Sequence, residues 1–142
     1  MTGHTFGSGA RVRCPCGSGE AYAACCGPLL AGEQAAGTAE ELMRSRYSAF
    51  ATGDAEYLAR TWHPRTRPDD LWLDPAMRWT GLTVLRTVGG DSDDDEGVVE
   101  FVATWVDSSA RRGGRGAAGE LHEVSRFVRR AGRWVYVDGD HG

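Results

Sequence analysis

The amino-acid sequence predicts an α+β fold in which helices pack on a strongly curved antiparallel sheet, preceded by a small metal-binding segment. Three observations support this prediction: two helical patterns within residues 38–60, four strand patterns within 79–138, and four cysteines that all fall within 14–26. A chain of 142 residues is long enough for one hydrophobic core and too short for two. We therefore expect a disordered start and a metal knuckle in residues 1–32, and a cone-shaped domain in residues 33–142.

Charge and hydropathy exclude several classes of function. The formal net charge is -4, so no global positive field would attract the chain to nucleic acid or to anionic lipid. No run of 18 apolar residues is present, and no apolar segment follows the first charges, so we expect neither a membrane span nor an export signal. These features predict a cytoplasmic protein.

The four cysteines lie in the segment CPCGSGEAYAACCG, and their spacing favours a metal site. Disulfides usually join distant segments of exported proteins, and a bridge between adjacent cysteines is strained because neighbouring Cα atoms are only about 3.8 Å apart. A redox motif would more usually show Cys-x-x-Cys beside a βαβ pattern. Four thiolates can instead complete a tetrahedron around one structural Zn²⁺, with the predicted ligands Cys14, Cys16, Cys25 and Cys26. Such a site is coordinatively closed, so we expect it to stabilise the fold and not to activate water.

The residues between the two cysteine pairs suit this geometry. Gly17 and Gly19 permit a tight backbone path with positive φ. Ser18 is positioned to cap a short helix over residues 20–24, which would deliver the second cysteine pair before Gly27-Pro28 ends it.

Residues 38–60 predict two consecutive helices. Thr38 and Glu41 form a capping-box pattern at the start of the first helix. Its apolar stripe consists of Ala39, Leu42, Met43, Tyr47 and Phe50. Gly53 is placed to end this helix, and Asp54 is placed to cap a second, shorter helix through Arg60. We expect residues 65–75 to be irregular.

Four strands are predicted at residues 79–88, 97–107, 120–130 and 133–138. A two-residue turn at Ala131-Gly132 would pair Phe127 with Tyr136 and Arg129 with Trp134. Alternation places one mainly aromatic set on the face under the helices: Val99, Phe101, Ala103, Trp105, Glu123, Ser125, Phe127, Trp134 and Tyr136. The opposite face carries Val98, Val102, Val106, Val124, Val128, Val135 and Val137. A face this rich in valine should be covered, either by a second subunit in a homodimer or by the zinc knuckle folded across it.

The cysteine segment closely resembles the SEC-C zinc motif found at the C-terminus of the SecA translocation ATPase. The last ligand there is commonly His, whereas this chain has Cys26. The segments GPLLAG, TAEELMRSRYSAFATGDAEYLARTWHP, FVATW and HEVSRFVRRAGRWVYVDG resemble the bacterial YchJ-like family, from about Cys14 to the C-terminus. That resemblance implies a cystatin-like cone of the nuclear-transport-factor-two-like fold. Because the motif of SecA contacts a chaperone and the ribosome, the resemblance also implies docking to a macromolecule.

Two functional hypotheses follow. In the first, the chain is an adaptor whose knuckle contacts a protein or a ribosome-like assembly through Arg11, Arg13 and Tyr22. The two arginines would also offset the excess negative charge of a zinc ion held by four thiolates.

In the second hypothesis, the cone interior is a small-molecule pocket that supports binding or acid–base chemistry. Its predicted wall residues are Tyr47, Trp105, Glu123, Ser125 and Tyr136. Glu123 is either a desolvated general base or the partner of Arg46, Arg78 or Arg129, and the second role is preferred because buried acids are usually paired. We assign no catalytic residue, and we expect His4 and His141, near the termini, to be disordered. An open cavity of a few hundred Å³ that reaches Glu123 would favour the pocket, whereas a solidly packed cone would favour docking.

Overall fold

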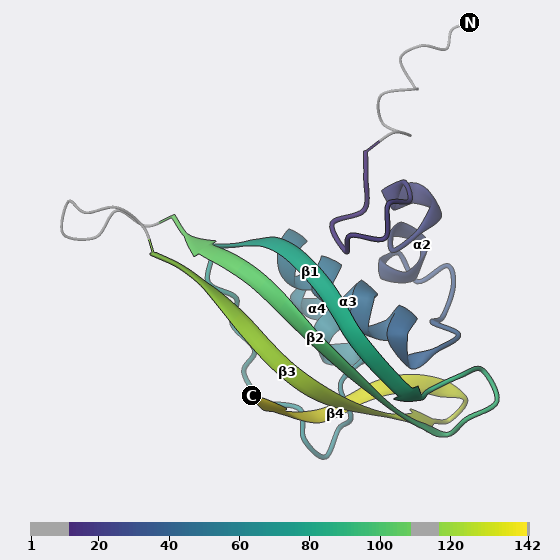
Figure 1. The fold of residues 1–142 in the computed structure, drawn as a ribbon. Helices are drawn as coiled ribbons and strands as arrows, with labels where there is room; N and C mark the ends of the chain where they lie inside the picture. Colours follow the sequence, from purple (N-terminus) through teal and green to yellow (C-terminus); the bar gives the residue numbers. More distant parts are fainter. Residues whose placement is uncertain (1–11, 109–116, 142) are drawn as a thin grey trace, which may run out of the picture.

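The computed structural model describes residues 12–108 and 117–141, and it shows the predicted α+β architecture (Figure 1). Short helices precede a four-stranded sheet in the chain. The helices are η1 (Tyr22–Ala24, a 3₁₀ turn), α2 (Gly27–Leu30), α3 (Ala39–Thr52) and α4 (Ala55–Arg60). The strands are β1 (Met77–Gly89), β2 (Glu96–Asp107), β3 (Ala117–Arg130) and β4 (Arg133–His141).

The sheet is antiparallel throughout, with the strand order β1-β2-β3-β4. At the β3–β4 turn, Ala131 and Gly132 both have positive φ, 53° and 81°, as a two-residue hairpin turn requires. The turn pairs Phe127 with Tyr136 and Arg129 with Trp134, as predicted. All four strands extend beyond the predicted ranges. A register shift follows Arg126, and two more lie in β1, so the strands are irregular where the sheet curves.

The two longer helices form as the sequence predicts because their ends carry capping chemistry. The hydroxyl of Thr38 accepts a hydrogen bond from the amide of Glu41 at 3.1 Å, and α3 ends at Gly53 with φ 81°. The carboxylate of Asp54 accepts from the amide of Tyr57 at 3.0 Å and caps α4. Figure 1 shows both helices lying on one face of the sheet.

Helix α3 is buried on more than one side. Toward the sheet, the rings of Tyr47 and Phe50 meet Trp79 at centroid distances of 6.2 and 6.1 Å. Away from the sheet, the hydroxyl of Ser45 lies 2.6 Å from the hydroxyl of Tyr57 on α4, and Ser48 faces the cysteine segment. The helix therefore connects the sheet interior to the N-terminal knuckle.

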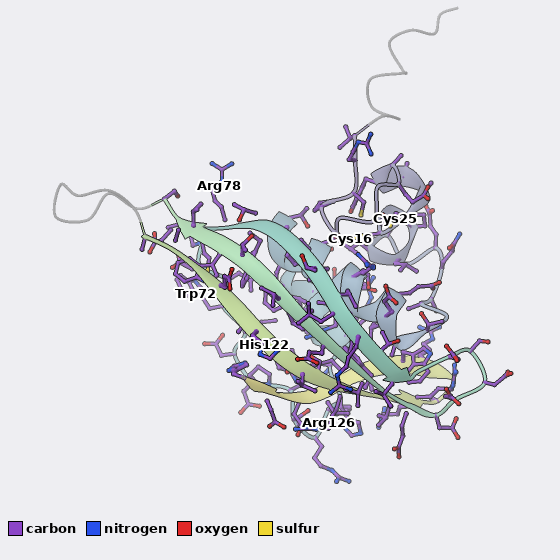
Figure 2. The ribbon with its side chains drawn as sticks, in the orientation of Figure 1. Cys16, Cys25, Trp72, Arg78, His122 and Arg126 are labelled. Atoms are coloured by element: carbon purple, nitrogen blue, oxygen red, sulfur yellow. The ribbon has the colours of Figure 1, made fainter. Side chains whose placement is uncertain are left out.

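The other sheet face combines valines with charged side chains. Val98, Val102, Val106, Val124, Val128 and Val137 are half-buried, and Val135 is buried. Between them, Glu100 binds Arg86 at 2.7 Å and His122 at 2.6 Å, and Arg126 binds Asp138 at 2.6 Å. Figure 2 labels His122 and Arg126 on this sheet.

The knuckle does not fold across the valine face. The prediction that the knuckle covers this face is therefore wrong. The knuckle packs instead against α3 on the helix side (Figure 1). Cover by a second subunit stays a prediction. Within residues 12–108 and 117–141, no helix has the length and apolar character needed to cross a membrane.

Candidate metal centre and ligand cavity

The structure brings the four cysteine sulfurs together. All four Sγ atoms lie within 4.8 Å of one another, and the Sγ of Cys25 is 3.6 Å from that of Cys16 and 4.0 Å from that of Cys26. Cys14, Cys16 and Cys26 are buried and Cys25 is half-buried, and none of the four forms a disulfide. A compact set of four soft sulfur donors has the chemistry of a tetrahedral metal site.

A narrow hairpin positions the first two cysteines. The amide of Cys14 donates to the carbonyl of Glu20 at 2.9 Å, and Arg13 pairs with Ala21 in an isolated bridge. Gly17 and Gly19 have φ of 81° and 88°, so the turn uses the positive φ expected of these glycines.

The connection to the second cysteine pair differs from the prediction. The expected helix over residues 20–24 is only the 3₁₀ turn η1, and the hydroxyl of Ser18 makes no helix cap. That hydroxyl accepts from the amide of Glu20 at 3.1 Å and lies 3.2 Å from the Sγ of Cys25. Gly27 and Pro28 begin α2 and do not end a helix, because proline in a first helical turn sacrifices no hydrogen bond.

The closeness of the sulfurs perturbs their protonation. A hydrogen bond from the Cys26 thiol, together with hydrogen bonds from Ser18, outweighs the opposing effect of burial and lowers the pKa of Cys16 to about 4. Hydrogen bonding to Cys16, together with burial, raises the pKa of Cys26. A divalent cation bound between these sulfurs would stabilise them as thiolates.

Helix α3 contributes two contacts that the sequence analysis did not predict. The guanidinium of Arg44 donates to the carbonyl of Cys16 at 2.9 Å, and the hydroxyl of Ser48 lies 3.6 Å from the Sγ of Cys14. These two α3 residues are four positions apart and so share one helix face, a spacing that could have signalled the contact. Figure 2 shows the labelled Cys16 and Cys25 beside the helices.

The predicted partner-contact residues lie on or before this knuckle. Arg13 is exposed, and its guanidinium donates to the carbonyl of Gly19 at 3.0 Å. Tyr22 is half-buried, with its ring against Gly27, where a Cβ atom would come within 3.2 Å of the ring. Arg11 lies outside the described residues.

A second candidate site is a cavity of about 230 Å³ between α3 and the aromatic face of the sheet. Four of the predicted wall residues line it: Tyr47, Glu123, Ser125 and Tyr136. Trp105 does not line it, because its ring lies against Gly119, where a Cβ atom would come within 2.6 Å of the ring.

Glu123 is buried, and its partners differ from the three arginines expected. Its Oε2 accepts from the hydroxyls of Ser125 at 2.7 Å and Tyr136 at 2.9 Å, and its Oε1 lies 3.0 Å from His141 Nε2. His141, expected to be disordered, is thus ordered at the end of β4. Burial, followed by the nearby Glu123 carboxylate, raises the pKa of Tyr136.

The expected arginine partners are engaged elsewhere or lie farther away. Arg129 donates to the carbonyls of Ser92 and Asp94, both at 2.8 Å, and its guanidinium lies 4.6 Å from the Trp134 ring centroid. Among the described residues, neither Arg46 nor Arg78 forms an ion pair with Glu123.

Two residues of the cavity wall, Arg46 and Trp62, were not predicted in that role, and Arg46 was expected only as a partner for Glu123. Arg46 Nη1 donates to the carbonyl of Leu58 at 2.9 Å and to the hydroxyl of Thr61 at 2.7 Å. Its guanidinium lies 4.9 Å from the ring centroid of Trp62 and 4.7 Å from that of Tyr136. The sequence could have indicated an interior position for Arg46, since this residue falls within the apolar stripe of the first predicted helix.

Comparisons with known proteins match both parts of the chain. Residues 13–28 match the model of the SEC-C motif, and residues 38–139 match a model described as "YchJ, middle NTF2-like domain". A UPF0225 protein of Streptomyces coelicolor is 55% identical over 127 residues, covering 89% of this chain and 94% of the relative. A UPF0225 protein of Chromobacterium violaceum is 52% identical over 134 residues, covering 92% and 93%.

Two solved structures share the architecture. The solution structure of a SEC-C motif containing protein from Rhodopseudomonas palustris has a TM-score of 0.72 at 38% identity and covers 89% of this chain and 96% of that one. The crystal structure of a SEC-C motif containing protein from Psychrobacter arcticus has a TM-score of 0.69 at 26% identity, with 92% and 83% covered.

Proposed function

The chain belongs to the YchJ (UPF0225) family, and from this premise we propose that it is a zinc-binding interaction protein whose SEC-C knuckle docks a macromolecular partner. The observation that carries the metal part is the gathering of four sulfurs within 4.8 Å of one another. Four thiolates suit Zn²⁺ and leave no position for a reacting water, so the ion would supply stability and no catalysis. Cys14, Cys16, Cys25 and Cys26 would hold it.

Metal analysis tests the zinc assignment. The purified protein is expected to contain about one equivalent of zinc by mass spectrometry, and Cys16→Ser is expected to lose most of it because three thiolates no longer close the tetrahedron. Ala24→Ser is the matched control, because it introduces the same side chain at an exposed position beside the cluster and removes no sulfur. Equal zinc in the Cys16→Ser protein, or a different metal in the wild-type protein, contradicts the assignment.

The docking part rests on the exposed edge of the knuckle. Val12 is 58% exposed beside the exposed guanidinium of Arg13, and the carbonyl of Val12 accepts from the amide of Tyr22 at 2.8 Å. An exposed apolar side chain next to a cation suits a protein segment that presents an apolar residue and a carboxylate. The metal would keep this edge rigid and so reduce the ordering cost of binding.

Site-specific photo-crosslinking in cells tests the docking proposal. A photoreactive residue at Val12 is expected to trap one defined protein, and the additional substitution Cys16→Ser is expected to abolish the product. A photoreactive residue at Leu85, which is 51% exposed on β1, is the control for random collision. Identical products from both positions, or a product that persists without the metal ligand, would exclude docking through the knuckle.

A second candidate function is small-molecule binding in the cone. The cavity of about 230 Å³ reaches Glu123, which is the observation that favours a pocket over a solid interior. Glu123, which lines the cavity, could then act on a bound molecule in acid–base chemistry.

A further inference from the structure

One side chain of the cavity wall, Arg46, has unused hydrogen-bond donors. Arg46 is only 5% exposed, and both of its hydrogen bonds leave from Nη1 and go to neutral oxygens. Within residues 12–108 and 117–141, no carboxylate lies at ion-pair distance from this guanidinium, and its Nε and Nη2 have no protein acceptor. Burial lowers the pKa of Arg46 to about 10, so the side chain is still a cation at neutral pH.

Trp62 adds an aromatic ring to the same wall. Its indole nitrogen is the buried side-chain polar atom that lacks a partner among the described residues. An unpaired buried N–H is costly, about 1–3 kcal/mol, but this nitrogen is closed off from the cavity, so a bound molecule would meet the ring of Trp62 and not its N–H. The guanidinium of Arg46 lies 4.9 Å from the ring centroid of Trp62, so the cation stacks on this ring.

Glu123, the carboxylate in this cavity, is already compensated. Ser125 and Tyr136 donate to one of its oxygens, and His141 lies at hydrogen-bonding distance from the other. Glu123 is close enough to oppose the fall in the pKa of Arg46, though not close enough to pair with it. The groups of the wall that still lack a hydrogen-bond partner are therefore mainly donors. A ligand that matches them carries a negatively charged acceptor.

The rest of the wall is apolar and aromatic, with Phe50, Trp79, Phe101, Leu121 and Phe127 among its residues. An apolar cavity of about 150 Å³ holds benzene. A cavity of about 230 Å³ therefore has room for one ring of that size and a small polar group.

We propose that the cavity binds a small carboxylic acid with a compact aromatic or similarly apolar body, its carboxylate accepting from Arg46 beside the Trp62 ring. This inference rests on the second candidate function, binding in the cone, and adds the chemical class of the ligand. The metal centre is a separate site, since no cysteine lines the cavity.

Titration by ¹H–¹⁵N NMR of the full-length, metal-loaded protein tests the class of ligand. The probes are benzoate, its neutral isostere benzamide, and toluene, which has the shape of the ring without a polar group. Benzoate is expected to shift the indole N–H signal of Trp62 saturably and to bind at least about tenfold more tightly than benzamide, since a charge-assisted hydrogen bond is stronger than a neutral one. The indole of Trp134, which donates to the carbonyl of Gly37 at 3.2 Å, is the internal control and should not shift. Trp62→Phe assigns the reporting signal.

Two variants separate charge recognition from cavity filling. Arg46→Gln is expected to weaken benzoate binding at least about tenfold and to leave toluene binding within about twofold. Ala103→Met places a larger side chain in the cavity wall, keeps Arg46, and is expected to weaken benzoate and toluene together. If Arg46→Gln does not fold, the three probes are compared on the wild-type protein and on Ala103→Met. That comparison still tests whether the cavity prefers a carboxylate.

Each result has a defined meaning. Benzamide or toluene binding as tightly as benzoate overturns the carboxylate class while cavity binding stands. Benzoate binding that survives Arg46→Gln, or that moves only signals outside the cavity, also overturns it. Failure of all three probes overturns cavity binding itself, and with it the second candidate function.

Discussion

Glu123 shows how the protein accommodates a buried carboxylate in an aromatic interior. The chain supplies donors from three side chains, and it also supplies space, because the carboxylate passes directly over Gly139 of β4. A Cβ atom at position 139 would overlap the carboxylate of Glu123. Gly139 has no positive φ, so its role is close approach and not backbone freedom.

Gly139→Ala is therefore expected to destabilise the protein by about 1–3 kcal/mol, as overpacking in a well-packed interior does. The measurement is urea-induced unfolding followed by tryptophan fluorescence. Gly37→Ala is the matched control, because a Cβ atom there makes only an ordinary contact with Glu41 at 3.5 Å, and its cost should be below about 0.5 kcal/mol. Equal stabilities for the two variants would show that Glu123 moves aside freely.

At the scale of elements, the sequence predicted the helices and the turn whose ends are set by interactions between nearby residues. Helices α3 and α4 and the β3–β4 turn formed as expected because caps, a positive-φ glycine and a two-residue turn each act within a few residues. The knuckle helix was misjudged because Gly-Pro can end one helix or begin another, and packing of the following leucines against the core selects the second outcome.

The partner of Glu123 could not be predicted for a different reason. A register shift after Arg126 displaces β4 by one residue and brings His141 opposite Glu123. A bulge of this kind depends on how the whole sheet curves, and no local pattern in the valine-rich sequence of β4 marks it. Gathering of the four cysteines, in contrast, could be predicted because all four belong to one short segment.

The capping of α3 leads to a prediction at this scale. Thr38→Ala removes the acceptor for the amide of Glu41 and is expected to lower the free energy of unfolding by about 1 kcal/mol. Thr83→Ala, on β1 and away from any helix end, is the comparison. Thermal unfolding of both variants checks the prediction, and no difference in Tm between Thr38→Ala and the wild-type protein would contradict it.

At the scale of the whole molecule, the knuckle and the cone share one core. Cys14, Cys16 and Cys26 belong to the same buried cluster as Leu42 and Leu58 of the helices. The knuckle is also held by a hydrogen bond from Arg44 of α3 to the carbonyl of Cys16. Loss of the metal should therefore affect α3 as well as the cysteine segment.

Hydrogen exchange before and after chelation measures this effect. Removal of zinc is expected to increase exchange in residues 13–31 most strongly and in α3 to a smaller extent, and to leave the central strands β2 and β3 protected. The Cys16→Ser protein should reproduce this pattern without a chelator, and added zinc should reverse it in the wild-type protein only. Exchange that rises equally in all four strands would show that the cone cannot fold without the metal.

Helix α3 has 14 residues, and its faces contact two different sites. Arg44 and Ser48 touch the cysteine hairpin, while Arg46 and Tyr47 line the cavity. If a bound metal or a cavity ligand displaces α3, it changes the binding free energy at the other site. Thermodynamic reciprocity makes the two effects equal in size. The zinc affinity of the protein with and without benzoate would then differ by the same factor as its benzoate affinity with and without zinc.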